Sequence, residues 1–200
     1  ALLDELRVLR RIRHPNVVLF HGAVVEPGAG SVALVYELIR GMQLDVVVKR
    51  TDPSRLNRFR MLYDISNALY YLHVQAPPII HSDLKGSNIM VEDLRSGFRA
   101  KVIDFGLSKF LARGAKAEGG SLGWSPPERF IHAGGADSVS ADVFSFGWLV
   151  HLAITGEGPY GDARGEALES AVAAMVLSGR APAPPLPGSA PWRAQCEALC

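Results

Sequence analysis

The polar residues whose types and spacing could do chemistry are gathered in two short segments of the chain. Asp83, Lys85 and Asn88 lie within six residues of one another, and Asp104 follows sixteen residues after Asn88, directly behind a short strand-like run. Transfer of a phosphoryl group from ATP needs a carboxylate that orients the attacking hydroxyl and accepts its proton, oxygen ligands for Mg²⁺, and a cation near the transferred phosphate. These four side chains supply that set, so the sequence predicts phosphoryl-transfer chemistry.

The elements before these segments must position them, and they begin with a helix and two strands. Apolar residues recur at helical spacing from Leu3 to Ile12, and two β-rich runs, Val17–Val25 and Val32–Leu38, flank a turn that contains Pro and Gly. Asp52-Pro53-Ser54 then opens a long helix that Pro77-Pro78 ends. We expect one face of that helix to be apolar, formed by Leu56, Phe59, Leu62, Ile65, Leu69 and Leu72.

The rest of the chain is predicted to contain loops, two short strands and a helical body. No element is assigned to the short segment that begins at Gly41. Strands are predicted at Asn88–Val91 and Ala100–Ile103, and helices at Val139–Thr155 and Gly165–Ser178. The order of helix, two strands and then mostly helices predicts an α+β fold with one strand-bearing edge and a helical body.

Composition and charge argue against several classes of function. The 21 Lys and Arg residues balance 20 Asp and Glu residues, so nothing general points to a nucleic-acid partner or an anionic membrane surface. No stretch reaches the roughly 18 apolar residues that a membrane span needs, and no secretory signal is visible. The two cysteines, Cys196 and Cys200, lie beside a last helix predicted near Trp192. Without a disulfide framework, we expect a reducing, cytoplasmic (intracellular) location.

Four motifs, in this order, resemble those of the eukaryotic protein kinase family. The run from His81 to Asn88 is similar to the catalytic loop, Asp104-Phe105-Gly106 to the metal-binding start of the activation segment, and Pro126-Pro127-Glu128 to its Ala-Pro-Glu end. Asp142, in Asp-Val-Phe-Ser-Phe-Gly, resembles the helix aspartate that anchors the catalytic loop. The resemblance covers essentially all 200 residues and implies a protein-kinase-like α+β fold.

That fold has two lobes, and the resemblance implies a part of each. Residues 1–36 resemble a partial N-lobe with an αC-like helix and two strands, and residues 37–200 resemble the hinge and a mainly helical C-lobe, truncated at its end. Glu5 resembles the αC glutamate that pairs with the ATP-contacting lysine. We expect the gene to encode that lysine and a glycine-rich loop upstream of Ala1. Residues 1–200 alone should therefore fold poorly and transfer phosphate inefficiently.

The resemblance also implies a role for each polar residue of the site. Asp83 is the catalytic base, Lys85 the contact to the γ-phosphate, and Asn88 and Asp104 are ligands of Mg²⁺. Ser121 is expected to hydrogen-bond through its hydroxyl to both Asp83 and Lys85. A lysine two residues after the aspartate, together with this serine, is the serine/threonine-type pattern.

A second set of residues is implied to bind ATP. Glu37, Leu38 and Ile39 resemble the hinge that bonds adenine through its backbone, and Tyr36 falls at the gatekeeper position. Met90 would form the floor under adenine. The implied cofactors are therefore ATP and Mg²⁺, and the implied partners are protein substrates.

Within the family, the run from His14 to Gly22 and the residue Trp124 resemble the tyrosine-kinase-like group, which mostly phosphorylates serine and threonine. The favoured hypothesis is a fragment of a protein serine/threonine kinase. One alternative is a pseudokinase or scaffold module without transfer activity, which the intact catalytic set disfavours. Another is a small-molecule phosphotransferase of related fold. That reading fits less well, because Trp124–Glu128 resembles a protein-substrate docking loop.

The first two residues of the run that resembles the catalytic loop, His81 and Ser82, have their own expected properties. Ser82 replaces the arginine that usually precedes the catalytic aspartate and receives an activation-segment phosphate, so we expect no phosphorylation-driven ordering by that route. His81 is expected to pack in a hydrophobic stack rather than to do acid–base work, and its expected partners are Leu9, Phe20 and Phe105.

Overall fold

The computed structural model of the protein describes residues 2–25, 32–110, 121–131, 138–161 and 165–178, and every structural statement below concerns these residues. The predicted helix near Trp192, with Cys196 and Cys200, lies outside them. The helices are α1 (Leu2–Leu9), α2 (Leu44–Thr51), α3 (Arg55–His73), the 3₁₀ turn η1 (Gly86–Asn88), α4 (Glu128–Ile131), α5 (Val139–Thr155) and α6 (Gly165–Ser178). The strands are β1 (Phe20–Val25), β2 (Val32–Tyr36), β3 (Gly41–Gln43), β4 (Ile79–Ile80), β5 (Ile89–Leu94), β6 (Gly97–Val102) and β7 (Lys109–Phe110).

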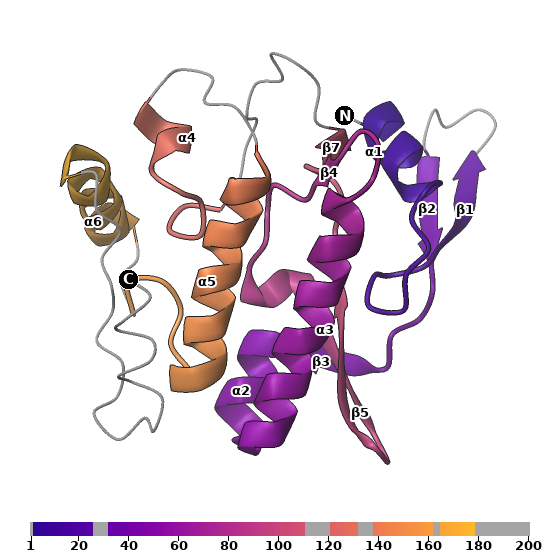
Figure 1. The fold of residues 1–200 in the computed structure, drawn as a ribbon, viewed down its shortest axis with the longest axis horizontal. Helices are drawn as coiled ribbons and strands as arrows, with labels where there is room; N and C mark the ends of the chain where they lie inside the picture. The colour runs from indigo at the N-terminus through magenta and orange to yellow at the C-terminus, as the bar shows by residue number, and fades with distance from the viewer. Residues whose placement is uncertain (1, 26–31, 111–120, 132–137, 162–164, 179–200) are drawn as a thin grey trace.

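Three small antiparallel sheets accompany the helices, which confirms the α+β prediction. β1 pairs with β2, β3 and β6 flank β5, and β4 pairs with β7. In Figure 1, α1 and the β1–β2 hairpin lie on one side of α3, and α4, α5 and α6 lie on the other. The small hairpin region and the larger helical body have the layout of the two expected lobes, although a boundary at residue 37 stays a prediction.

The first predicted strand is shorter in the structure, because its beginning pairs elsewhere. β1 starts at Phe20, whereas Val17 forms a parallel bridge with Val102 and the Val18 N–H donates to the Val102 carbonyl at 2.9 Å. This part of the chain therefore ties the hairpin to the end of β6. Asp104 follows two residues after the end of β6.

The long helix α3 forms where predicted, but its buried face is different. Ser54 caps it by accepting a hydrogen bond from the Asn57 N–H at 3.3 Å, as the Asp-Pro-Ser start implies. Two residues expected on the apolar face, Leu56 and Phe59, are exposed, which makes that part of the prediction wrong. At about 100° per residue, these two side chains lie on the face opposite Ile65, whereas Arg58 in the same turns donates to the Ala153 carbonyl of α5. The buried face is formed by Met61, Ile65, Ala68, Leu69 and Leu72.

The segment that begins at Gly41 forms both β3 and α2, neither of which the sequence predicted. Leu44, Val47 and Val48 of α2 are buried, and the helix contacts η1 and α5. Burial of this β-branched face outweighs the weak helix propensity of valine.

The helices α5 and α6 have the predicted bounds. Ser138 caps α5 by accepting a hydrogen bond from the Ala141 N–H, and Gly156, in the left-handed region at φ 81°, ends it. One core joins α1, α3 and the β5–β6 hairpin, with Leu9, Ile65 and Phe105 among its most buried side chains. None of the helices described here is both long and apolar enough to cross a membrane.

Candidate active site

A buried carboxylate on α5 anchors the segment that carries Asp83. Asp142 is 1% exposed and accepts hydrogen bonds from the His81 N–H at 2.9 Å, the Ser82 N–H at 3.0 Å and the His73 Nε2 at 2.8 Å. Three donors compensate a charge that would otherwise be costly to bury. The anchoring role expected for Asp142 is therefore present in the geometry.

The β5–β6 hairpin brings Asn88 and Asp104 to the same end of one sheet. Asn88 directly precedes β5, Asp104 follows β6, and the Ile103 N–H donates to the Asn88 carbonyl at 2.9 Å. Gly97, at φ 116°, is the first residue of β6 after the turn at the other end of this hairpin, where a residue with a β-carbon would be strained. Asn88 and Asp104, sixteen residues apart in the sequence, therefore lie close together.

The side chain of Asn88 is oriented by its neighbours. Its Nδ2 donates to the Asp83 carbonyl at 2.8 Å and to Asp83 Oδ2 at 3.1 Å. Both acceptors require an N–H, so the amide has a fixed orientation and its oxygen is left to bind something else. Asp104 is exposed, and one of its oxygens accepts a hydrogen bond from the Gly106 N–H at 3.2 Å.

Lys85, Asp83 and Ser121 form one hydrogen-bonded cluster. Lys85 Nζ donates to Asp83 Oδ2 and to the Ser121 hydroxyl oxygen, both at 2.8 Å. The backbone N–H of Ser121 donates to Asp83 Oδ1 at 2.9 Å. The expected bridge is present, but the Ser121 contact to Asp83 that these distances define runs through the backbone rather than through the hydroxyl.

These contacts set the charge state of Asp83. Burial raises the pKa of this carboxyl, but hydrogen bonds from Lys85 and Ser121 and the positive charge of Lys85 lower it by more. The pKa of Asp83 therefore lies below its ordinary value, and the group is ionised at neutral pH.

His81 packs against Phe105 as predicted, whereas its contact with Leu9 and Phe20 stays a prediction. It is fully buried, and its ring meets that of Phe105 edge-on with centroids 5.0 Å apart. Its Nε2 lies 3.1 Å from the Ile103 carbonyl, which can only accept, and its Nδ1 accepts from the Asp83 N–H at 3.3 Å. This pattern requires a neutral imidazole that holds the loop in place.

The expected hinge carries an ion pair that the sequence did not indicate. Both carboxylate oxygens of Glu37 accept hydrogen bonds from Lys101 Nζ, at 2.6 and 2.7 Å, and one also accepts from the Leu19 N–H at 2.8 Å. Burial raises the pKa of Glu37, but Lys101 and the Leu19 N–H outweigh it, and the pKa is lowered. The side chain of Glu37 thus holds the hinge against β6.

The other residues predicted to bind ATP differ in their exposure to solvent. Tyr36 is half-buried and packs edge-on against Phe20, with ring centroids 5.7 Å apart. Ile39 and Met90 are half-buried, and Leu38 is exposed. Their contact with adenine stays a prediction. Glu5 lies in α1, but its side chain is outside the part of the chain that the structure describes.

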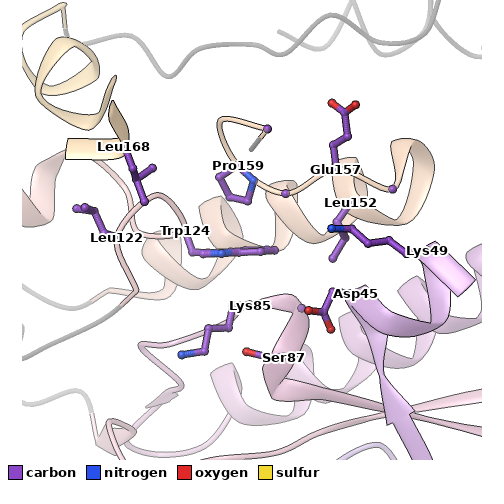
Figure 2. Close-up of a pocket in the computed structure, with 14 residues that line it drawn as sticks. Asp45, Lys49, Lys85, Ser87, Leu122, Trp124, Leu152, Glu157, Pro159 and Leu168 are labelled. Carbon is purple, nitrogen blue, oxygen red and sulfur yellow. The ribbon is translucent and has the colours of Figure 1, made fainter. Parts of the chain in front are cut away.

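A cleft of about 560 Å³ opens beside Lys85. Figure 2 shows the flat ring of Trp124 between Leu122 and Leu168 on one side and Leu152 on the other, above Lys85 and Ser87. Charged side chains also line it, and they come from α2 and from the segment after α5: Asp45, Lys49 and Glu157. Both apolar and charged surface is therefore available next to Asp83 and Lys85.

The chain matches the family described as Protein kinase domain over residues 1–187. It is 38% identical over 79% of its length to a probable serine/threonine-protein kinase of Dictyostelium discoideum, and 35% identical over 80% to the serine/threonine-protein kinase CTR1 of Arabidopsis thaliana. It is 28% identical over 80% to ankyrin repeat and protein kinase domain-containing protein 1 of Homo sapiens. The chain belongs to the protein kinase family.

These comparisons confirm the expected fold and the resemblance to the tyrosine-kinase-like group of serine/threonine kinases. The chain spans only 15%, 20% and 21% of the length of these three relatives. Members of the family use ATP with a divalent metal ion, and their substrates are proteins.

Proposed function

We propose that this chain is the catalytic part of a protein serine/threonine kinase that transfers the γ-phosphoryl group of ATP to protein hydroxyls. One observation supports this most strongly. Asp83, Lys85, Asn88 and Ser121 are joined by hydrogen bonds of 2.8–3.1 Å into a single ionised cluster. A binding or scaffold module has no need of such a cluster, so its retention favours transfer chemistry over the pseudokinase alternative.

In this proposal Asp83 orients the acceptor hydroxyl. The lowered pKa makes its carboxylate a weak base, so its main task is to accept the hydroxyl hydrogen bond and point the oxygen at the γ-phosphorus. The bond from the hydroxyl oxygen to phosphorus forms as the bond to the ADP oxygen breaks, and the released proton passes to Asp83. Lys85 places a positive charge beside the transferred group.

The donor set fits Mg²⁺, which we assign to Asn88 and Asp104. The Asn88 amide has its nitrogen committed to Asp83, and Asp104 is an exposed carboxylate at the same end of the β5–β6 hairpin. Mg²⁺ prefers few protein oxygens and takes its remaining ligands from water and phosphate. When bound, the ion neutralises charge on the phosphates of ATP.

For ATP itself, we propose that the backbone of Glu37 and Ile39 forms hydrogen bonds with adenine. Tyr36 would lie at the back of the adenine pocket, and Met90 beneath the adenine ring. The Glu37–Lys101 ion pair supports this assignment, because it fixes the hinge against β6. Glu5 would pair with an ATP-contacting lysine.

A protein substrate fits the cleft beside Lys85 better than a small molecule does. The cleft combines an aromatic and aliphatic wall with charges from α2 and from the segment after α5, and it opens on the surface. A peptide offers both kinds of side chain at once. We also propose an intracellular location, since a kinase needs ATP and the sequence has only two cysteines.

The proposal is tested by replacing Asp83 with asparagine in the natural protein. We expect Asp83→Asn to lower kcat by about 10³-fold or more while ATP binds almost as before, because hydroxyl orientation acts in the transition state. Asp93→Asn, an exposed carboxylate on β5, is the matched control and should keep full activity. Equal activity of Asp83→Asn and the unaltered protein, or no phosphoryl transfer by either, would contradict the proposal.

A further inference from the structure

A cation from the end of the activation segment reaches the catalytic loop. Arg129, the second residue of α4, donates through Nη1 to the backbone carbonyl of Ser82 at 2.7 Å and to the Ser125 hydroxyl oxygen at 3.4 Å. Ser82 and Arg129 are 47 residues apart in the sequence. The contact therefore joins two segments that the chain does not hold together by itself.

The conformation of Ser82 requires such a contact. Its φ of 70° lies in the left-handed region, which is unfavourable for a residue with a β-carbon and persists only where the surroundings impose it. Its N–H is held by Asp142 and its carbonyl by Arg129. Its own hydroxyl is buried and has no hydrogen-bond partner among the described residues. The backbone of Ser82 is thus fixed from both sides, and its side chain takes no part.

With Arg129, the second half of the activation segment is attached to the catalytic loop at both of its ends, while Ser108 in the first half donates to the His81 carbonyl at 3.0 Å. Ser121 donates through its N–H to Asp83, and Arg129 donates to the neighbouring Ser82. Between them, the Ser125 N–H donates to the Ser121 carbonyl at 3.3 Å and the Arg129 N–H to the Pro126 carbonyl at 3.2 Å, so the segment is folded on itself. The Arg129 contact thus fixes the end of the segment at the catalytic loop, in addition to the contact of Ser121 with Asp83.

A phosphate has little opportunity to provide this support instead. Between Asp104 and Glu128 the sequence contains three hydroxyl residues: Ser108, Ser121 and Ser125. Ser108 is 4% exposed and donates to the His81 carbonyl, and Ser125 is 3% exposed. Ser121 accepts from Lys85 within the catalytic cluster. None of the three is a free hydroxyl on the surface.

We infer that Arg129 is a positioning residue: it holds Ser82, and through it Asp83, in the working geometry, and so makes the site independent of activation-segment phosphorylation. The catalytic consequence rests on the proposed kinase function. The structural consequence, a catalytic loop fastened to α4, does not depend on it.

The test uses Arg129→Met, which removes the donor at similar length, and Arg129→Lys, which keeps a charge and one donor group. Arg95→Met, an exposed arginine in the β5–β6 turn, is the control. In the natural protein we expect Arg129→Met to lower kcat at least tenfold, with the KM for ATP changed less than twofold. The kcat of Arg129→Lys should lie between that of Arg129→Met and that of the unaltered protein. Phosphatase treatment of the unaltered protein should change kcat less than twofold.

Hydrogen exchange separates this inference from the proposed function. We expect Arg129→Met to accelerate amide exchange at least tenfold in residues 81–85 and 121–131, with β5 and β6 unchanged. Accelerated exchange in a protein without any kinase activity would uphold the fastening by Arg129 and overturn the proposed function. Unchanged exchange and unchanged kcat in Arg129→Met, or a large loss of kcat on phosphatase treatment, would overturn the role given to Arg129.

Discussion

The catalytic loop and the β1–β2 hairpin are held by different means. Residues 81–88 have little regular structure, yet His81, Ser82 and Asn88 are buried and bonded to Asp142, Asp83 or Ile103. The hairpin forms five residue pairs, with an irregularity between Phe20 and Gly22, but most of its side chains are exposed, including Val25 at 66%. Regular backbone pairing and firm tertiary anchoring are therefore separate properties in this protein.

The catalytic loop and the hinge are therefore positioned by different kinds of contact. Asp83 must be held within about 0.5 Å of its working position, and the two residues before it are fixed by hydrogen bonds to the buried carboxylate of Asp142 on α5. The hairpin side is joined to the rest through the Val17–Val102 bridge, the Glu37–Lys101 ion pair and the burial of Phe20 in the core. A two-stranded sheet is marginal by itself, so the position of the hinge depends on these links.

The largest effect is expected where the catalytic loop loses its anchor. Asp142→Asn removes the charge that accepts from His81, Ser82 and His73 and presents an amide N–H₂ to backbone donors. Leaving buried donors unsatisfied costs about 1–3 kcal/mol each, so we expect the free energy of unfolding to fall by about 3–5 kcal/mol. Urea denaturation measures this, with Asp93→Asn as control. A loss no larger than that of the control would mean that the loop is held by something else.

A smaller effect is expected at the link between the two regions. Lys101→Met removes the partner of Glu37 and should lower the free energy of unfolding by about 1 kcal/mol at neutral pH. Because the pKa of Glu37 is lowered in the folded state, its contribution is present above the ordinary pKa and is lost as pH falls through the folded pKa. The difference between the variant and the unaltered protein should therefore disappear on acidification, which urea titrations across that pH range will detect. A difference that stays constant with pH would rule out the ion pair as its cause.

The smallest effect is expected on the exposed face of the hairpin. Val25→Thr replaces an exposed valine by a residue of similar shape and good strand propensity. We expect a change in the free energy of unfolding within about 0.5 kcal/mol, whereas Ile65→Ala, in the buried face of α3, should cost about 2–5 kcal/mol. Comparable losses for both variants would show that the β1 face is covered in the natural protein.

The sequence predicted the elements and contacts that depend on nearby residues. The bounds of α5 and α6 follow from apolar periodicity, and the contacts of Asp83 with Lys85 and Asn88 join residues that lie within one short motif. The contact of Ser121 with Lys85, 36 residues away, was expected from the family resemblance alone. The packing of His81 against Phe105 was predicted from the resemblance alone.

Contacts between distant segments could not be predicted in the same way. Nothing in the local pattern links Glu37 to Lys101, 64 residues apart, or Ser82 to Arg129. The helix α2 was missed because three consecutive valines favour a strand locally, and only burial against η1 and α5 reverses that preference. Leu56 and Phe59 were predicted on the buried face because of a three-residue spacing, but that spacing drifts by about 60° per step from the helical period, so both lie on the side of α3 opposite Ile65 and are exposed.

Native-state hydrogen exchange measured amide by amide tests the central claim most directly. If buried partners hold the catalytic loop, the His81 and Ser82 amides, which donate to Asp142, should exchange only through opening close to global unfolding. The amides of Val24 and Val35 in the hairpin should exchange through openings of clearly lower free energy. Hairpin amides that are protected as strongly as His81 and Ser82, or loop amides that exchange faster than the hairpin, would contradict this account.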